Sequence, residues 1–139
     1  MSAVPVAERD LARMLATLQA TRREGEYVYV SRAQPDATLA AQAHAWIREA
    51  EGISYVIARE DADAQGLDYA FVAAWLSLQV HSALEAVGLT AAFSTALARQ
   101  GIACNVLAGY YHDHLLVPAD RAGDALAALA ALRRPADTH

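Results

Sequence analysis

The sequence has a single cysteine, Cys104, and no long apolar stretch. One cysteine excludes an intrachain disulfide framework and agrees with a reducing compartment. No apolar run approaches the roughly 18 residues that a membrane-spanning helix needs. Near the N-terminus, Glu8, Arg9 and Asp10 interrupt the only stretch that could act as a signal peptide. We therefore expect a cytoplasmic protein without a membrane span.

Positive charge is also scarce. Lysine and arginine together number 11 against 16 acidic residues, which gives a formal net charge of -5. Only Arg22 with Arg23 and Arg133 with Arg134 are adjacent, and solvated faces or helix ends account for both pairs. Because nucleic-acid binding needs clustered cations, we expect no nucleic-acid partner.

The chain does have enough apolar material for a compact core. It contains 139 residues, of which 55% are hydrophobic and 19% charged. This size and composition fit one ordinary domain or two small subdomains that share a core. Alanine makes up much of the apolar fraction, so most burial must come from Leu, Val, Ile and aromatic residues.

The first half reads as a helix followed by strands. Apolar side chains at helical spacing predict the helix, and arginines followed by Gly25 have the order that closes one. Runs rich in β-branched and aromatic residues predict strands between polar turns. These signals divide the half into a helix at 5–20, a strand at 26–31, a turn at 32–38, a strand at 53–59 and a short helix at 61–65.

Residues 39–50 give conflicting signals. Their helix propensity is high, but Trp46 and Ile47 stand before a turn at Glu51 and Gly52 that leads into a strand. That order is typical of a hairpin. From the residues alone, both a helix and a strand over 43–49 remain open.

The second half alternates strands and helices after a link at residues 68–74. Leu76, Leu78 and Val80 alternate with polar residues, which predicts a strand with one core face. Gly88 precedes an amphipathic helix that Gly101 ends. The remaining elements are a buried strand at 102–109, a strand at 112–117, a helix at 119–132 and a tail at 133–139. This order predicts an α/β sandwich with helices on one face of the sheet.

Residues 80–118 carry a specific motif, VHSALEAVGLTAAFSTALARQGIACNVLAGYYHDHLLVP. It resembles the small bacterial ACT-domain proteins, a group once catalogued as a family of unknown function. Their members read VHSSLEAVGLTAA and NVIAGYYHDHIFVP at the matching places, and the resemblance extends over residues 51–132. Ala83 replaces a second serine, which removes a hydroxyl contact. Leu115 and Leu116 replace an Ile-Phe pair, which is an apolar exchange.

The resemblance implies two ACT-like subdomains in tandem, each a ferredoxin-like βαββα unit, with an antiparallel sheet and helices on one face. Residues 1–67 would form the N-terminal subdomain, residues 68–132 the C-terminal one, and 133–139 a tail. It also implies a strand at residues 43–49. ACT domains are regulatory modules that often bind amino acids at subunit or subdomain interfaces and are not catalysts. The resemblance therefore implies no enzyme activity and no cofactor, and we further expect a homodimer.

The turn at residues 85–90 is the first candidate site. It leads into a helix N-terminus, whose free N–H groups and positive dipole end favour a carboxylate. Gly88 lets the backbone approach a ligand or adopt a positive φ. Asn105 is polar in an apolar strand, and in ACT domains a residue at this place commonly meets the ligand. A plain capped turn and a structural hydrogen bond are the alternatives. The predicted ligand-binding residues are Ser82, Glu85, Val87, Gly88, Leu89, Thr90, Asn105 and Val106.

The segment at residues 110–114 is the second candidate site. On a strand, His112 and His114 share one face, so their imidazoles could chelate a metal with His81 as a third ligand. No further cluster has metal-site spacing, so we expect no metal and interpret the segment as polar or interface residues. These residues are His81, Tyr110, Tyr111, His112, Asp113 and His114.

Catalytic readings of the same residues lack support. Neither a hydrolase triad of His81, Ser82 and Asp113 nor a thiol pair of Cys104 with His112 has the sequence context of a nucleophile elbow. We predict no catalytic residue and a non-enzymatic sensor that binds an amino acid or a similar small zwitterion. Two alternatives stay open: a ligand-free module that binds a partner protein, and a metal-dependent enzyme that uses the segment 112–114.

Overall fold

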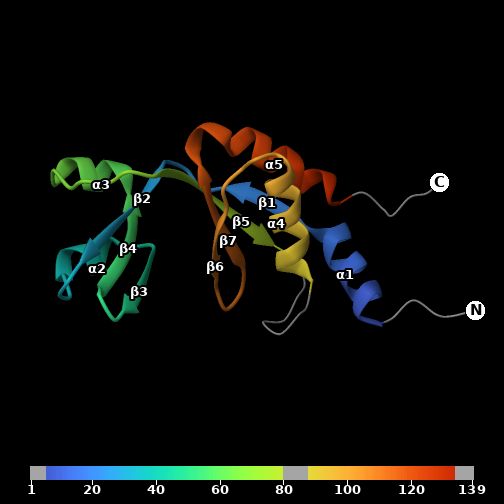
Figure 1. Ribbon diagram of the computed structural model, residues 1–139, viewed down its shortest axis with the longest axis horizontal. Coiled ribbons are helices and arrows are strands. Elements are labelled where there is room, and N and C mark those ends of the chain that lie inside the picture. Colours follow the sequence, from blue (N-terminus) through green and yellow to red (C-terminus); the bar gives the residue numbers. More distant parts are fainter. Residues whose placement is uncertain (1–5, 80–87, 134–139) are drawn as a thin grey trace, which may run out of the picture.

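The computed structural model describes residues 6–79 and 88–133, without the side chains of residues 6–10. Its centre is a curved antiparallel sheet with strand order β3-β4-β2-β5-β7-β6, and β1 also pairs with β5 (Figure 1). The first half contains α1 (Val6–Thr17), β1 (Gln19–Arg22), β2 (Tyr27–Arg32), α2 (Ala37–Gln42), β3 (Ala45–Glu49), β4 (Gly52–Ala58) and α3 (Arg59–Ala64). The second half contains β5 (Val72–Gln79), α4 (Leu89–Arg99), β6 (Asn105–Ala108), β7 (Asp113–Pro118), the 3₁₀ helix η1 (Ala119–Arg121) and α5 (Ala122–Ala131). No helix in these two described stretches is long and apolar enough to cross a membrane.

Two βαββα units follow each other along the chain, and each is completed by a fourth strand from outside the unit. The unit β2-α2-β3-β4-α3 pairs with the beginning of β5, where Tyr27 stands opposite Ala73. The unit β5-α4-β6-β7-α5 pairs with β1, where Gln19 stands opposite Gln79. The predicted tandem ferredoxin-like fold is confirmed. The predicted boundary between residues 67 and 68 stays a prediction.

A bulge separates β1 from β2. The Arg23 N–H donates to the Trp75 carbonyl at 2.8 Å and so continues the pairing of β1 with β5. Pairing resumes at Tyr27 and Ala73, which leaves residues 24–26 opposite Ala74 alone. Because a bulge of this kind bends its strand, the sheet turns at this point from one unit into the next.

The helices of both units cover the same face of the sheet. In the first unit, β2 and β4 pack with α2 and α3 through Val28, Val30, Leu39, Ile53, Tyr55, Ile57 and Ala62. In the second unit, β5 and β7 pack with α4 and α5 through a cluster that includes Leu76, Leu78, Phe93, Leu97, Leu115, Val117 and Leu129. Val28 stands opposite Val72, and Val72 shares a strand face with Leu76. The predicted placement of the helices on one face is therefore confirmed.

The opposite, helix-free face has an apolar cluster of its own. It consists of Tyr27, Val56, Ala73, Trp75 and Leu116, which come from both units. Trp75 is only 2% exposed although no helix of the described chain covers it. The curvature of the sheet and the side chains around Trp75 supply this burial.

The predicted helix over residues 5–20 is wrong in its last part. α1 ends at Thr17, and the next residues form β1. The pair at 22–23 and Gly25 belong to a strand and a bulge, not to a helix end. Pairing with β5 and complete burial of Leu18 in the core override the local helix propensity.

Other predicted elements differ mainly at their ends. The predicted strand at 43–49 is confirmed by β3, and the helix propensity before it appears as the short helix α2, which Asp36 caps at 2.9 Å. The predicted link at 68–74 is wrong from residue 72 onward, because β5 begins there to pair with β2. The predicted strand at 102–109 is shortened to β6, the part that pairs with β7.

We predict that Gly52→Ala is strongly destabilising. Gly52 opens β4 with a φ of 149°, and a β-carbon there would lie 2.3 Å from the Arg32 carbonyl oxygen. The backbone must shift to relieve this clash, so the free energy of unfolding should fall by more than about 2 kcal/mol. Gly66→Ala is the matched control, since Gly66 has a φ of 67° but no atom within 4 Å of a β-carbon. It should lose only about 1 kcal/mol. Urea unfolding compares the two, and equal losses would contradict the clash.

Candidate functional site

Gly88 forms the N-terminus of α4. Its φ of 96° is a left-handed conformation that glycine adopts without strain. No side chain of the described residues caps the helix, so among these residues no side chain accepts from the N–H groups of its first turn. Leu89 is buried in the core and Thr90 is exposed. This end of α4 can accept a negatively charged group.

One side of Gly88 is occupied by α1. A β-carbon at Gly88 would lie 3.1 Å from Cδ2 of Leu11. We predicted that Gly88 lets the backbone approach a ligand. On this side of Gly88, the group that approaches the backbone is the Leu11 side chain of α1.

Four predicted site residues, His81, Ser82, Glu85 and Val87, lie outside the described residues. Their proposed contacts stay predictions.

Asn105 and Val106 lie on β6, an edge strand of the sheet. Asn105 is exposed rather than buried, and Val106 is half-buried against the core. The register places Asn105 opposite Leu116, level with Trp75, whereas Ala108 is level with the end of β5 near Leu78. Asn105 therefore lies about 10 Å along the strand direction from the level of Leu78, which is near the end of β5.

The segment 110–114 divides between a turn and a strand. Tyr110 and Tyr111 project into solvent with 78% and 80% of their surface exposed. His112 is exposed in the turn, where the Gly109 N–H donates to its carbonyl at 2.9 Å. His114 is half-buried on β7, with its ring centroid 6.4 Å from that of His112.

Metal and thiol chemistry find little support in this part of the molecule. Across residues 6–79 and 88–133, no three His, Cys, Asp or Glu side chains lie close enough to hold a metal ion. Burial raises the pKa of the half-buried Cys104 thiol, which lowers the fraction of reactive thiolate.

A group of polar side chains surrounds Trp75 on the helix-free face. The Arg23 guanidinium carbon lies 4.1 Å from the centroid of the Trp75 ring, and Arg23 also donates to Nδ1 of His44 at 3.1 Å. On the other side, the Trp75 N–H lies 3.2 Å from both the Ser77 hydroxyl oxygen and Nδ1 of His114, and the Ser77 hydroxyl lies 2.9 Å from the same nitrogen. We call Arg23, His44, Trp75, Ser77 and His114 the Trp75 cluster.

Sequence reasoning did not find this cluster. It placed Ser77 among the polar residues that alternate with Leu76 and Leu78. It assigned Arg23 to a solvated face or a helix end and His44 to no site. The alternation in β5 gave the available signal, but only the bulge and the sheet pairing bring these residues together.

The environment of the Trp75 cluster favours neutral histidines. Burial lowers the pKa of His44 and of His114, and the positive charge of Arg23 lowers each pKa further. Asp61 opposes the shift at His44, and Asp113 opposes it at His114. Both rings therefore resist protonation in the folded chain.

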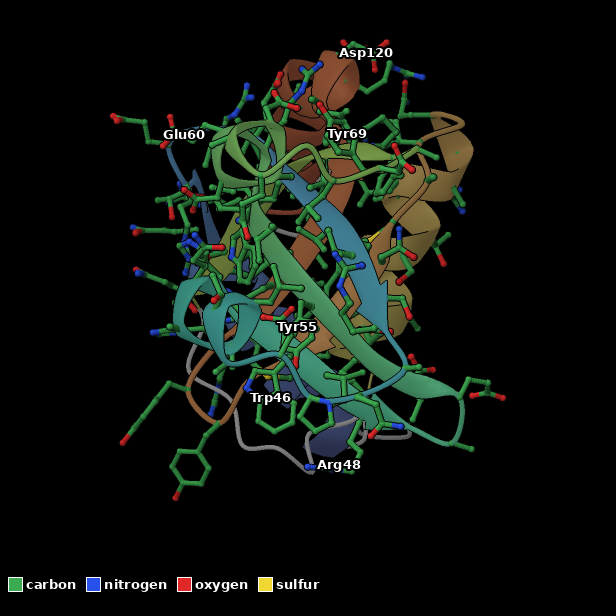
Figure 2. All side chains as sticks on the ribbon, turned by 90° about the vertical axis from the view of Figure 1, so that its left-hand side faces the viewer. Trp46, Arg48, Tyr55, Glu60, Tyr69 and Asp120 are labelled. Carbon is green, nitrogen blue, oxygen red and sulfur yellow. The ribbon has the colours of Figure 1, made fainter. Side chains whose placement is uncertain are left out.

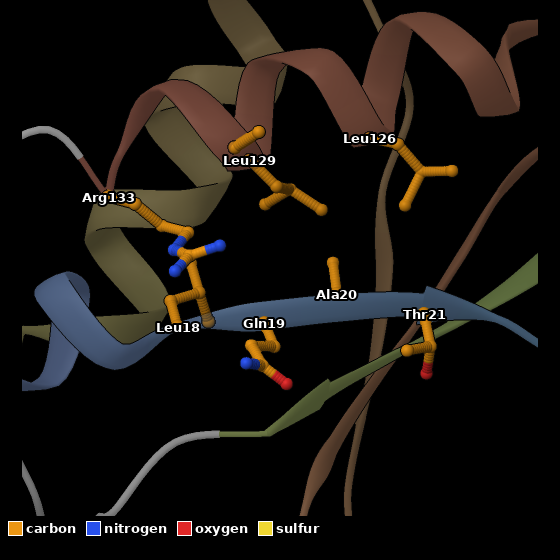
Figure 3. Close-up of a pocket in the computed structure, with 8 residues that line it drawn as sticks. Leu18, Gln19, Ala20, Thr21, Leu126, Leu129 and Arg133 are labelled. Atoms are coloured by element: carbon orange, nitrogen blue, oxygen red, sulfur yellow. The ribbon is translucent and has the colours of Figure 1, made fainter.

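The cavities on the surface of the described residues include an acidic one and an apolar one. One, of about 620 Å³, is lined by Glu24, Gly25, Glu26, Tyr27, His44, Ala58, Arg59, Glu60, Asp61 and Asp63. Within it Arg59 pairs with Glu26 at 2.8 Å, which leaves most of the acidic wall free of cations. The other, of about 410 Å³, is an apolar groove between β1 and α5, where Leu126 and Leu129 face Ala20 (Figure 3).

Acidification should destabilise the fold through His44 and His114. Their folded pKa values lie below the ordinary value of 6.5, so the unfolded chain takes up protons first. The free energy of unfolding therefore rises with pH in this range and falls as pH is lowered through it. The double variant His44→Gln with His114→Gln should show a shallower slope in urea unfolding between about pH 7.5 and 5.5. An unchanged slope would refute this origin.

Comparisons with known proteins identify the fold. ACT-domain family profiles match residues 6–74 and residues 71–131. No protein with a curated description matches the chain. The chain is 37% identical to a Vibrio cholerae protein of unknown function, described as a possible transport protein. That alignment covers 92% of this chain and 99% of that one, with a TM-score of 0.84.

More distant structures share the fold alone. A protein from Agobacterium tumefaciens is 18% identical over 84% of this chain and 89% of its own, with a TM-score of 0.62. The structure of aspartokinase α and β subunits is 16% identical over 81% of this chain and 95% of that one, with a TM-score of 0.58. Two ACT domains in one chain indicate a regulatory role through the binding of a small molecule. The chain belongs to the ACT-domain family and carries two ACT domains in tandem.

Proposed function

We propose that this protein is a non-enzymatic regulatory module that binds an amino acid or a similar small zwitterion. The observation that carries the proposal is the N-terminus of α4, where Gly88 takes a left-handed conformation and no described side chain caps the helix. Free N–H groups and the positive end of the helix dipole attract a carboxylate. The ACT-domain assignment supports the regulatory part.

The remaining contacts extend the proposal beyond the described site. Ser82, Glu85 and Val87 would surround the ligand from the segment that precedes Gly88. Asn105 is level with Trp75 rather than with the end of β5, and it is exposed on the edge strand β6. We therefore assign Asn105 and Val106 to the ligand contact of a second copy in a homodimer. A cytoplasmic location belongs to the same proposal.

A thermal-shift panel of the common amino acids tests ligand binding. A ligand present at 100 times its dissociation constant should add about 2.7 kcal/mol to the free energy of unfolding, which raises the midpoint by several degrees. Calorimetry with the best amino acid gives the stoichiometry. If no amino acid at millimolar concentration shifts the midpoint, the sensor proposal fails.

The location of the site can be tested with a charge at the first turn of α4. Thr90→Asp places a carboxylate where the ligand carboxylate would bind, and Thr90 is exposed, so the fold should tolerate the change. Like-charge repulsion of about 1 kcal/mol should weaken binding about fivefold. Thr95→Asp, exposed farther along the same helix, is the matched control and should bind as the parent does. Equal affinities of the two variants would move the site elsewhere.

A ligand-free interaction module is the second candidate, and exposed aromatic residues favour it. Trp46 and Ile47 on the edge strand β3 are 51% and 49% exposed, and Tyr110 and Tyr111 are more exposed still. Figure 2 shows Trp46 and Arg48 projecting from the surface, while Tyr55 lies beneath α2. The packing of Leu11 against Gly88 also limits the space at α4. A negative amino-acid panel would favour this candidate.

A further inference from the structure

The Trp75 cluster lies on the helix-free face of the sheet and contains residues of both units. Arg23 follows β1 directly and precedes the bulge, and His44 comes from the segment before β3 in the first unit. Ser77 and His114 come from β5 and β7 of the second unit. The rings of His44 and His114 lie 6.0 Å and 5.4 Å from the Trp75 ring, so both flank the same indole as Arg23.

Arg23 differs from the other half-buried arginines of the described chain. Arg32 pairs with Asp36, Arg59 with Glu26 and Arg121 with Asp124. Arg23 has no carboxylate within ion-pair distance among the described residues; its partners are the neutral ring nitrogen of His44 and the face of Trp75. A guanidinium that is held in place without a counter-charge is suited to bind an anion.

The hydrogen bond from Arg23 fixes the proton position on His44. An arginine can only donate, so Nδ1 of His44 accepts from Arg23. The neutral ring of His44 must then carry its proton on Nε2. This Nε2–H finds no acceptor among the described residues, so the ring keeps one donor for a ligand.

A cavity adjoins the cluster at His44. This cavity, of about 620 Å³, is lined by His44 and by Tyr27, whose ring packs against that of Trp75. Its volume is in the usual range of small-molecule sites. Its lining also includes Glu24, Glu60 and Asp61, which repel a ligand with negative charge throughout. The arrangement suits a ligand with one oxyanion group and a neutral or cationic remainder.

We propose that the Trp75 cluster is a binding site for the oxyanion group of a small metabolite, held by Arg23 and His44. This site lies on the helix-free face and is separate from the proposed amino-acid site at α4. A carboxylate and a phosphate share the required chemistry. The site places a ligand across both units, where its binding would stabilise one curvature of the sheet.

Trp75 offers a direct optical readout. The chain has two tryptophans, so a Trp46→Phe background leaves Trp75 as the only one. Sodium acetate and inorganic phosphate are titrated in separate arms at constant ionic strength, with sodium chloride as the salt control. We expect a saturable change of Trp75 fluorescence with at least one oxyanion and none with chloride. A response to acetate alone identifies a carboxylate ligand, and a response to phosphate alone a phosphate ligand.

Arg23→Gln in the same background tests the central contact. Loss of a charge-assisted hydrogen bond should weaken binding at least about tenfold. Arg22→Gln is the matched control, because Arg22 is the exposed neighbour in β1, and its affinity should stay within about twofold of the parent. Circular dichroism checks the fold of both variants. If Arg23→Gln does not fold, His44→Ala replaces it, with the same weakening expected.

Two outcomes would overturn the proposal. One is the absence of a saturable response to either oxyanion in the folded Trp46→Phe protein. The other is an equal response in the Arg23→Gln and Arg22→Gln variants. Neither result bears on amino-acid binding at α4, because the thermal-shift panel and the Thr90→Asp variant test that site separately.

Discussion

Backbone pairing of β5 with both β1 and β2 is the constraint on which the fold depends. β5 is the first strand of the second ACT unit and completes the sheet of the first, so neither sheet reaches four strands without it. Its side chains also enter the cores of both faces: Leu76 and Leu78 pack under α4 and α5, and Trp75 lies on the opposite face. The two units therefore share one strand and cannot be expected to fold independently.

The same pairing positions both candidate sites. α4 returns along the helix-covered face after β5, so its N-terminus at Gly88 lies on that side of the sheet. On the other face, Arg23 continues the pairing of β1 with β5 opposite Trp75, and its guanidinium lies over the Trp75 ring. A ligand at α4 would contact mainly the second unit, whereas a ligand at the Trp75 cluster would contact both. Sheet curvature offers a physical route by which the two sites could be coupled.

Prediction from the sequence succeeded where a local pattern and a specific motif agreed. The alternation of Leu76 and Leu78, and the helix ended by Gly101, were readable because each depends on neighbours close in sequence. The strand at 43–49 required the family resemblance, since Trp46 and Ile47 lie in a stretch of high helix propensity. The end of α1 was missed because Leu18 and the residues of β1 respond to β5, some 60 residues away.

By itself the sequence determined the fold class, the helix-covered sheet and the turn at Gly88, because apolar periodicity and glycine conformation are local properties. Only the tertiary structure decided that β1 is a strand, that Asn105 is exposed away from the end of β5, and that Arg23 meets His44 and His114 around Trp75. These facts depend on strand register and on the bulge. Register is set by long-range pairing, which no local stretch of the chain encodes.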